Sequence, residues 1–217
     1  MLHTVSQISL GASSEWSKAQ SGGRFSTPIG DLLLVAHAQG LSGIWFVNQR
    51  HFAAKLPADM VQQFLAQDAA QSSDPILQAT VSWLRCYFGS GQEDTLGQED
   101  TLLTPMESMP TGSEPTLPAL PPLYLLGTPF QQAVWQELLR VPYGQTISYA
   151  QLTAQVVQRL QLPPSYKGYR GVAQAVGHNP VSILVPCHRI IGSNGKLTGF
   201  ASGLEHKEFL LHLEGAL

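Results

Sequence analysis

Charged residues are scarce in this chain. Only 12% of its 217 residues are Asp, Glu, Lys or Arg, about half the usual share, so networks of surface ion pairs are not expected. No run approaches the roughly 18 apolar residues of a membrane-spanning helix. Residues 1–20 also lack the basic start and apolar core of a secretory signal. We therefore expect no membrane partner.

Cysteine is scarce too. The chain has only Cys86 and Cys187, which excludes a disulfide scaffold and a four-thiolate zinc site. This usage favours a reducing compartment, so we expect a cytoplasmic protein, associated with the nucleoid in a bacterium or nuclear in a eukaryote. Each thiol then needs its own explanation. Cys86 lies in a predicted helix, and we interpret it as a partly buried packing residue.

Charge is distributed unevenly along the chain. Residues 1–127 contain 5 Lys/Arg and 11 Asp/Glu, whereas residues 128–217 contain 7 and 4. The second part is therefore mildly basic. That balance is compatible with nucleic-acid contact through the second part alone.

The sequence of the N-terminal half predicts an α/β domain over residues 23–90. Residues 1–22 show no helix or strand periodicity and are predicted to be an extension. Short apolar runs at 32–36 and 44–47 flank Gln39-Gly40 and predict two paired strands joined by a turn. A helix is predicted from Asp74, because Asp is a favoured N-cap and Pro75 a favoured first helical residue.

Residues 91–123 differ in composition from the rest. The hexapeptide at 91–96 is repeated at once at 97–102, and acidic, Pro-rich sequence follows. Such composition cannot bury enough apolar surface to fold, so we predict a linker.

The remaining residues, 124–217, are predicted to form a mostly helical domain. Capping boxes at Thr128 to Gln131 and Ser148 to Gln151 each predict a helix start. A third helix is expected from about 165–168 to Val176. Two short helices joined by a turn are typical of a helix-turn-helix.

A Pro-Cys-His-Arg tetrad follows a buried apolar run at 181–185. Basic neighbours lower a thiol pKa and raise its thiolate fraction, which indicates a reactive Cys187. Pro186 restricts the backbone just before it. From these residues alone, a buried structural cysteine following a strand remains the alternative.

The wider sequence resembles the methylated-DNA–protein-cysteine methyltransferases, also called 6-O-alkylguanine-DNA alkyltransferases. The resemblance covers 124–217, and more loosely 24–50. It rests on these matches: Gly127-Thr-Pro-Phe-Gln131, Val134-Trp135, Pro142-Tyr143-Gly144, Ser148-Tyr149, Arg170-Gly171-Val172, Asn179-Pro180, Pro186-Cys187-His188-Arg189, Gly195-Lys-Leu-Thr-Gly-Phe200, Gly203-Leu204, Lys207 and Leu210-Leu211.

The resemblance implies an α+β fold, with a small N-terminal α/β domain containing a ribonuclease-H-like sheet, a linker, and a winged helix-turn-helix-like C-terminal domain. It implies DNA repair by a monomer, without cofactor or metal, on double-stranded DNA containing alkylated guanine. Cys187 would take the alkyl group irreversibly from 6-O-alkylguanine in a single turnover, and activity on 4-O-alkylthymine is left open by the sequence. No N-terminal Cys/His cluster supports the structural zinc of some relatives.

The resemblance also implies residue roles. His188 would act as base through a water, oriented by Glu214, while Asn179 would bond the backbone near the cysteine. Tyr149 would contact a nucleotide rotated out of the helix and supply a proton to guanine. The implied DNA contacts are Arg170, Gly171, Ala173, Tyr149 and Arg189. The implied substrate pocket comprises Val185, Pro186, Ile190, Phe200, Ala201 and Lys207.

Three features depart from the family pattern. Phe200 replaces the usual Tyr, Ala201 replaces Ser or Gly, and the stretch from Tyr149 to Arg170 is several residues longer than expected. The longer stretch enlarges the turn beside the implied DNA-binding face.

Three other functions are open. An alkyltransferase-like protein would bind the lesion without transfer, but that class has another residue at position 187. A DNA-binding regulator would show sequence preference and tolerate Cys187→Ser. A thiol hydrolase would need an oxyanion site and steady-state turnover, for which the sequence gives no clear support.

Overall fold

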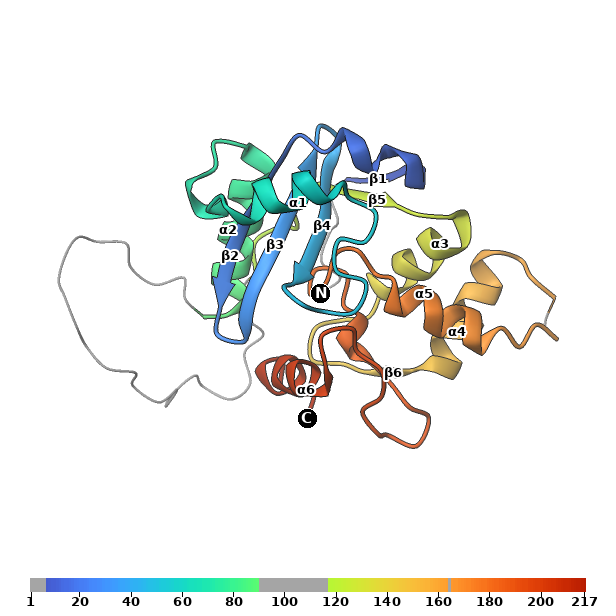
Figure 1. The fold of residues 1–217 in the computed structure, drawn as a ribbon. Coiled ribbons are helices and arrows are strands. Elements are labelled where there is room, and N and C mark those ends of the chain that lie inside the picture. The colour runs from blue at the N-terminus through green and yellow to red at the C-terminus, as the bar shows by residue number, and fades with distance from the viewer. Residues whose placement is uncertain (1–6, 90–116, 164) are drawn as a thin grey trace.

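The computed structural model describes residues 7–89, 117–163 and 165–217. Its elements are arranged as a sheet layer with helices around it (Figure 1). In chain order they are β1 (Ile8–Gly11), η1 (Ser13–Lys18), β2 (Ser21–Thr27), β3 (Gly30–His37), β4 (Gly40–Phe46), α1 (Ala58–Leu65), η2 (Ala69–Gln71), α2 (Pro75–Tyr87), β5 (Leu123–Leu126), α3 (Pro129–Leu138), β6 (Ile147–Ser148), α4 (Tyr149–Arg159), α5 (Tyr169–Gly177), η3 (Cys187–Arg189), β7 (Ile190–Ile191) and α6 (Leu204–Leu213).

Five strands form a mixed sheet in the order β1-β5-β4-β3-β2. Strands β2, β3 and β4 pair antiparallel, whereas β1 and β4 run parallel to β5. In β3, alternate side chains enter two separate cores. Leu32 and Leu34 pack in one, and Leu33 and Val35 in the other. Because both faces of β3 are buried in a core, its sequence is a continuous apolar run and not an alternating one.

The predicted turn at Gln39-Gly40 is confirmed, since it joins β3 to β4. Gly40 has a φ of 147°, and a Cβ there would lie 2.6 Å from the carbonyl oxygen of Pro122. Only glycine fits both the backbone conformation and this close approach. The turn therefore also brings β4 against the segment that enters β5.

The ends of the sheet domain differ from the prediction. Residues 1–22 were expected to be an extension, but Ile8–Gly11 forms edge strand β1, which pairs with β5. Trp16, 3% exposed, packs on Trp45, because a large apolar ring is stabilised by burial. The predicted C-terminal domain started at 124, yet Leu123–Leu126 belongs to the sheet. Most of the predicted linker, including both hexapeptides, lies outside the described residues.

The helix predicted from Asp74 is confirmed as α2. The Asp74 carboxylate accepts hydrogen bonds from the backbone N–H groups of Ile76 and Leu77. Cys86 is partly buried in this helix, as predicted. Helix α2 packs on the sheet through its apolar side, which places its last residue, Tyr87, beside the C-terminal part of the chain.

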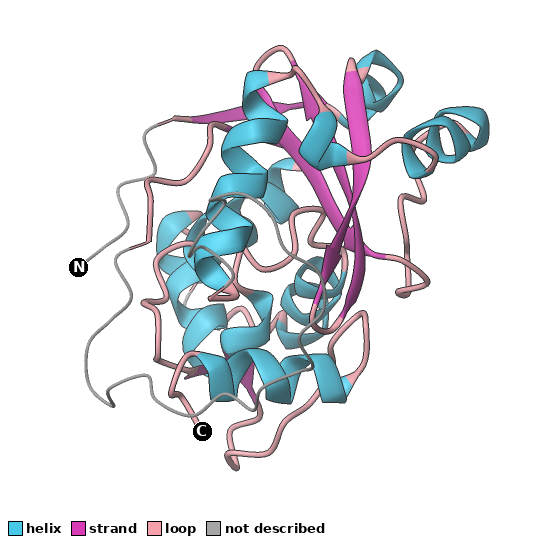
Figure 2. Cartoon of the chain, turned by 90° about the vertical axis from the view of Figure 1, so that its left-hand side faces the viewer, coloured by secondary structure: helices cyan, strands magenta, loops and turns pink. Residues whose placement is uncertain are grey.

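Residues 128–217 contain the predicted helices. Both capping boxes are present, Thr128 with Gln131 at α3 and Ser148 with Gln151 at α4. Helices α3, α4 and α5 pack on one another, and Figure 2 shows helices on both sides of the twisted sheet. The predicted α+β class, with a small sheet domain and a helical C-terminal domain, is confirmed.

Backbone hydrogen bonds join the two parts. The Ile44 N–H of β4 donates to the Pro180 carbonyl at 2.8 Å, and the Ser182 N–H donates to the Ile44 carbonyl at 3.0 Å. The sheet therefore holds the segment that leads to Cys187. Among the described residues, no helix combines the length and apolar character needed to cross a bilayer.

Candidate active site

Cys187 lies at the start of η3, after a buried segment that is bonded to β4. Ile183 in this segment has a φ of 72°, which is rare for a β-branched residue and strains the backbone. The Val185 N–H donates to the Val181 carbonyl at 2.9 Å, closing a tight turn. The predicted buried run is thus a turn rather than a strand, and it fixes the position of the cysteine.

Asn179 holds the sulfur directly. Its Nδ2 donates to Cys187 Sγ at 3.1 Å and to the Val185 carbonyl at 2.8 Å, and its Oδ1 accepts from the Val181 N–H at 3.0 Å. Three hydrogen bonds therefore fix the orientation of this amide. The predicted backbone contact is present, and the contact to sulfur is an additional one.

Burial has the largest effect on the pKa of the Cys187 thiol. Cys187 is 5% exposed, and burial raises its pKa above the usual 9.0, although the Asn179 hydrogen bond and the Lys207 charge oppose the rise. The sequence had predicted a lowered pKa from basic neighbours. That prediction is wrong for the free protein, because desolvation of the thiolate outweighs the nearby positive charge.

The positive charge near the sulfur comes from Lys207. Its side chain is fully buried, and its Nζ donates to the carbonyl oxygens of Ile190 and Thr198. Burial lowers the Lys207 pKa to about 8, while the Cys187 thiolate opposes this change. At neutral pH the amine still carries its proton, so it stabilises a thiolate at Cys187.

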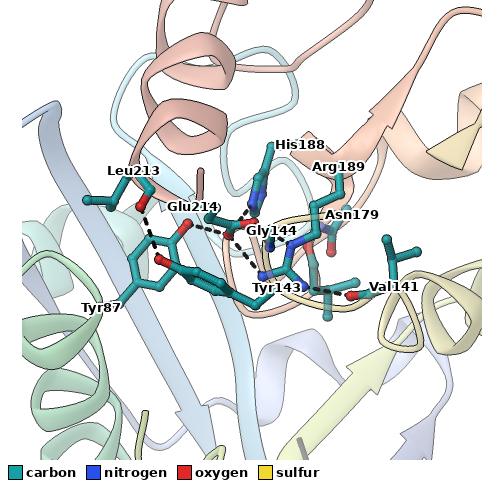
Figure 3. A network of polar contacts seen from close by, with 10 residues as sticks. Tyr87, Val141, Tyr143, Gly144, Asn179, His188, Arg189, Leu213 and Glu214 are labelled. Atoms are coloured by element: carbon teal, nitrogen blue, oxygen red, sulfur yellow. Dashed lines mark hydrogen bonds and ion pairs between the residues drawn. The ribbon is translucent and has the colours of Figure 1, made fainter. Parts of the chain in front are cut away.

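Glu214 joins His188 and Arg189 in a buried network (Figure 3). His188 Nε2 lies 2.8 Å from Oε1, Arg189 Nε lies 2.7 Å from Oε2, and Arg189 Nη2 lies 2.9 Å from Oε1. Burial alone would raise the Glu214 pKa, but His188 and Arg189 outweigh it and hold that pKa well below the usual range. Glu214 is therefore an ionised carboxylate at neutral pH.

An ionised carboxylate can only accept, so His188 Nε2 must carry the proton in this contact. The other ring nitrogen, Nδ1, is buried and has no hydrogen-bond partner among the described residues. Burial lowers the His188 pKa, although Glu214 opposes this. His188 is therefore a neutral imidazole with a free basic nitrogen next to Cys187 in the chain.

Cys187 and Asn179 line a pocket of about 390 Å³, whereas His188 and Glu214 are not among its lining residues. Of the residues predicted to form a substrate pocket, Phe200 and Ala201 line it. Val185, Pro186, Ile190 and Lys207 do not, and the prediction is wrong for these four. All four are buried, and Lys207 is held by its hydrogen bonds to the Ile190 and Thr198 carbonyls, so they have no free surface.

The DNA-contact prediction for Arg189 is also wrong. The Arg189 side chain is buried, paired with Glu214, and donates to the Val141 carbonyl at 2.7 Å. Its charge is thus neutralised inside the protein. By contrast, Arg170 and Ala173 are exposed on α5 and Gly171 is partly exposed.

Tyr149 lines the pocket from the first residue of α4. Burial, and the nearby Cys187 charge to a smaller degree, raise its pKa to about 12. The phenol therefore keeps its proton at neutral pH and can donate a hydrogen bond into the pocket. Ala173 and Gln174 of α5 line the same pocket, so the exposed face of α5 borders the entrance.

Sequence reasoning missed Arg50 and His51, which line the pocket from the N-terminal half. The Arg50 N–H donates to the Ala201 carbonyl at 2.9 Å, and His51 stacks on His178 with ring centroids 4.2 Å apart. No periodicity or motif marks these loop residues. The loop is recognisable only in the structure, where Asn48, His51 and Ala53 have positive φ.

Comparisons with known proteins identify the family of this chain. A family model described as "6-O-methylguanine DNA methyltransferase, DNA binding domain" matches residues 129–216. A methylated-DNA–protein-cysteine methyltransferase of Methanosarcina mazei is 36% identical over 188 residues, which cover 87% of this chain and 92% of that protein.

Solved structures give the same result. The crystal structure of the Mycobacterium tuberculosis O6-methylguanine methyltransferase has a TM-score of 0.60 and 30% identity, covering 90% of this chain and 93% of its own. A complex of the Mycobacterium tuberculosis protein with DNA has a TM-score of 0.59 and 30% identity, covering 91% and 94%. The chain therefore belongs to the methylated-DNA–protein-cysteine methyltransferase family.

Proposed function

We propose that this protein repairs DNA by moving an alkyl group from the 6-oxygen of guanine to Cys187, once per molecule. One observation carries the proposal: Cys187 lines an open pocket and is followed by His188, whose Nε2–H is held by Glu214 and whose buried Nδ1 has no hydrogen-bond partner in the described part of the chain. This arrangement suits a thiol that must lose its proton before it reacts. Family membership supports the same activity.

The reaction uses each polar group in turn. His188 Nδ1 takes the thiol proton through a water molecule, and Lys207 stabilises the thiolate. The sulfur attacks the alkyl carbon, a carbon–sulfur bond forms, and the carbon–oxygen bond breaks with its electron pair going to guanine. Tyr149 donates a proton to the leaving base, which is restored as guanine, and the proton taken by His188 returns through solvent to the Tyr149 phenolate. The thioether at Cys187 is not hydrolysed, so the protein is consumed.

Lesion recognition requires the nucleotide to leave the duplex. The alkyl carbon cannot align with Cys187 while the base is stacked, so the base rotates into the pocket. Helix α5 presents Arg170 to solvent, and Ala173 borders the pocket. DNA lying against α5 would place the rotated base near Cys187, with Arg170 filling the vacated space. The chain has no Asp or Glu between Glu137 and Glu205, which favours approach of a polyanion.

The same chemistry extends to 4-O-alkylthymine, whose alkyl carbon is equally bonded to an exocyclic oxygen. We propose that the protein acts as a monomer, without a cofactor, in the compartment that holds the DNA. An alkyltransferase-like binder that recognises the lesion without transfer is the second candidate. Cys187 in the pocket argues against it.

Intact mass tests the proposal. After mixing with a duplex carrying one 6-O-methylguanine, the wild-type chain should gain about 14 Da, because a methyl group replaces the thiol hydrogen. Peptide mapping should place the gain on Cys187. Cys86→Ser should gain the same mass, whereas Cys187→Ser should gain none and still bind the duplex. No gain in the wild-type chain, or a gain on Cys86, would refute the assignment.

A further inference from the structure

The catalytic network has a member from the N-terminal half of the chain. Tyr87, the last residue of α2, is 2% exposed. Its hydroxyl donates to Glu214 Oε1 at 2.7 Å, across 127 positions of sequence. Figure 3 shows this hydroxyl pointing at the carboxylate from the opposite side to His188. Helix α2 thus contacts Glu214, the carboxylate that orients the proposed base His188.

Donors converge on one oxygen of that carboxylate. Oε1 accepts from Tyr87, from His188 Nε2 and from Arg189 Nη2, whereas Oε2 accepts from Arg189 Nε and, at 3.5 Å, from the Gly144 N–H. A carboxylate has about four acceptor sites, so this one is saturated. The orientation of the Glu214 carboxylate is therefore fixed, and its negative charge is stabilised by donors from three parts of the chain.

We propose that Tyr87 is a positioning residue for alkyl transfer, which holds Glu214 Oε1 against His188 Nε2 and limits how strongly that carboxylate acts on the imidazole. This inference rests on the proposed function of Cys187. It implies that the sheet domain contributes to the reactivity of the cysteine, in addition to supporting the fold.

A second tyrosine provides a matched comparison. Tyr143 packs edge-to-face on Tyr87, with ring centroids 6.3 Å apart, but its hydroxyl donates to the Leu213 backbone carbonyl at 3.1 Å. Burial raises the pKa of Tyr87 well above 10 and that of Tyr143 to about 12. Both phenols therefore keep their protons, and they differ in what accepts the hydrogen bond.

The direction of the electrostatic effect follows from the groups around His188. The charged groups that act on it are Glu214, Arg189 and Lys207. Glu214 raises the His188 pKa, while burial and the two cations lower it. The Tyr87 hydroxyl draws part of the carboxylate charge toward itself. Removing that hydroxyl leaves more negative charge facing His188, so the His188 pKa should rise.

The test is the pH dependence of single-turnover transfer from a 6-O-methylguanine duplex, measured with the full chain. Tyr87→Phe keeps the ring and removes only the hydroxyl. It should slow transfer about tenfold at neutral pH, since the carboxylate loses a fixed donor. The acid limb of its profile should move to higher pH by on the order of half a unit. Tyr143→Phe should leave that limb in place.

A structural role alone would lower the rate equally at every pH. An unmoved acid limb in Tyr87→Phe, or the same shift in Tyr143→Phe, would overturn the inference. If Tyr87→Phe does not fold, Tyr87→Met, a smaller and flexible apolar side chain without a hydroxyl, should show the same shift. An NMR titration of His188, assigned with His188→Gln, should show the raised pKa without any DNA. Absence of transfer in the wild-type chain would instead refute the proposed function.

Discussion

The sheet region and the helical region bury different kinds of side chain. Among residues 7–89, no Asp, Glu, Lys or Arg is buried, and strands β3 and β4 are lined by fully buried apolar residues such as Leu34 and Ile44. Residues 128–217 bury Glu137, Arg189, Lys207 and Glu214. Buried ion pairs contribute little net stability, because desolvation offsets the attraction. Apolar burial in the sheet region therefore stabilises the fold, whereas the helical region buries the charged groups of the candidate active site.

The two regions are nevertheless coupled. Strand β4 holds the segment before Cys187 through backbone hydrogen bonds, and α2 supplies Tyr87 to Glu214. Apolar packing in the sheet thus supports the geometry of a polar site that has little stability of its own. Variants that act on one region but not the other can test this division.

The largest effect on transfer is expected at the buried carboxylate. Glu214→Gln keeps the shape but removes the charge that orients His188, so transfer should slow on the order of a hundredfold. It also leaves Arg189 unpaired, which should destabilise the fold by about 3–5 kcal/mol. Glu208→Gln, an exposed change in the helix α6 that precedes Glu214, is the control and should affect neither. Single-turnover kinetics and thermal melts measure the two quantities.

The Glu214→Gln variant should also change how the stability of the fold depends on pH. The Glu214 pKa is lowered in the folded protein, so its contribution to stability is complete above its ordinary pKa of 4.5 and is lost as pH falls below that value. The Tm of the wild-type chain should therefore fall more steeply than that of Glu214→Gln below about pH 4.5. Parallel curves would argue against an ionised, paired carboxylate.

A smaller effect is expected on the DNA-facing surface. Arg170→Ala should slow repair of duplex DNA by about tenfold, because nothing then fills the space left by the rotated base. Reaction with the free 6-O-methylguanine nucleoside should be almost unchanged, since no base has to be unstacked. Arg24→Ala, an exposed change in β2, is the control. Equal losses on duplex and nucleoside would contradict the proposed role of Arg170.

The smallest effect on transfer is expected in the sheet core. Leu34→Ala should destabilise the fold by about 2–5 kcal/mol through a cavity, yet leave the transfer rate constant of the folded protein unchanged at low temperature. Leu204→Ala, at a residue that is 47% exposed, should alter stability little. A slowed rate in Leu34→Ala would mean that the sheet core transmits strain to the site.

Local patterns predicted much of the fold. Capping residues at Asp74, Thr128 and Ser148 marked three helix starts correctly, because capping is a contact between near neighbours in the chain. Strand β1 was missed, since four residues with weak pattern become a strand only when β5 provides an edge. Strand β5 was placed in the wrong domain because the predicted linker, 91–123, spans 33 residues, and pairing across such a distance leaves no local signal.

The sequence by itself determined the Pro-Cys-His-Arg tetrad, the helix starts and the family resemblance, since each depends on residue identity and spacing. The tertiary structure alone decided that burial raises the Cys187 pKa, that Arg189 faces Glu214 and not DNA, and that Tyr87 joins the network. The physical reason is that desolvation and ion pairing depend on which groups meet in space, and these groups come from α2, η3 and the end of α6.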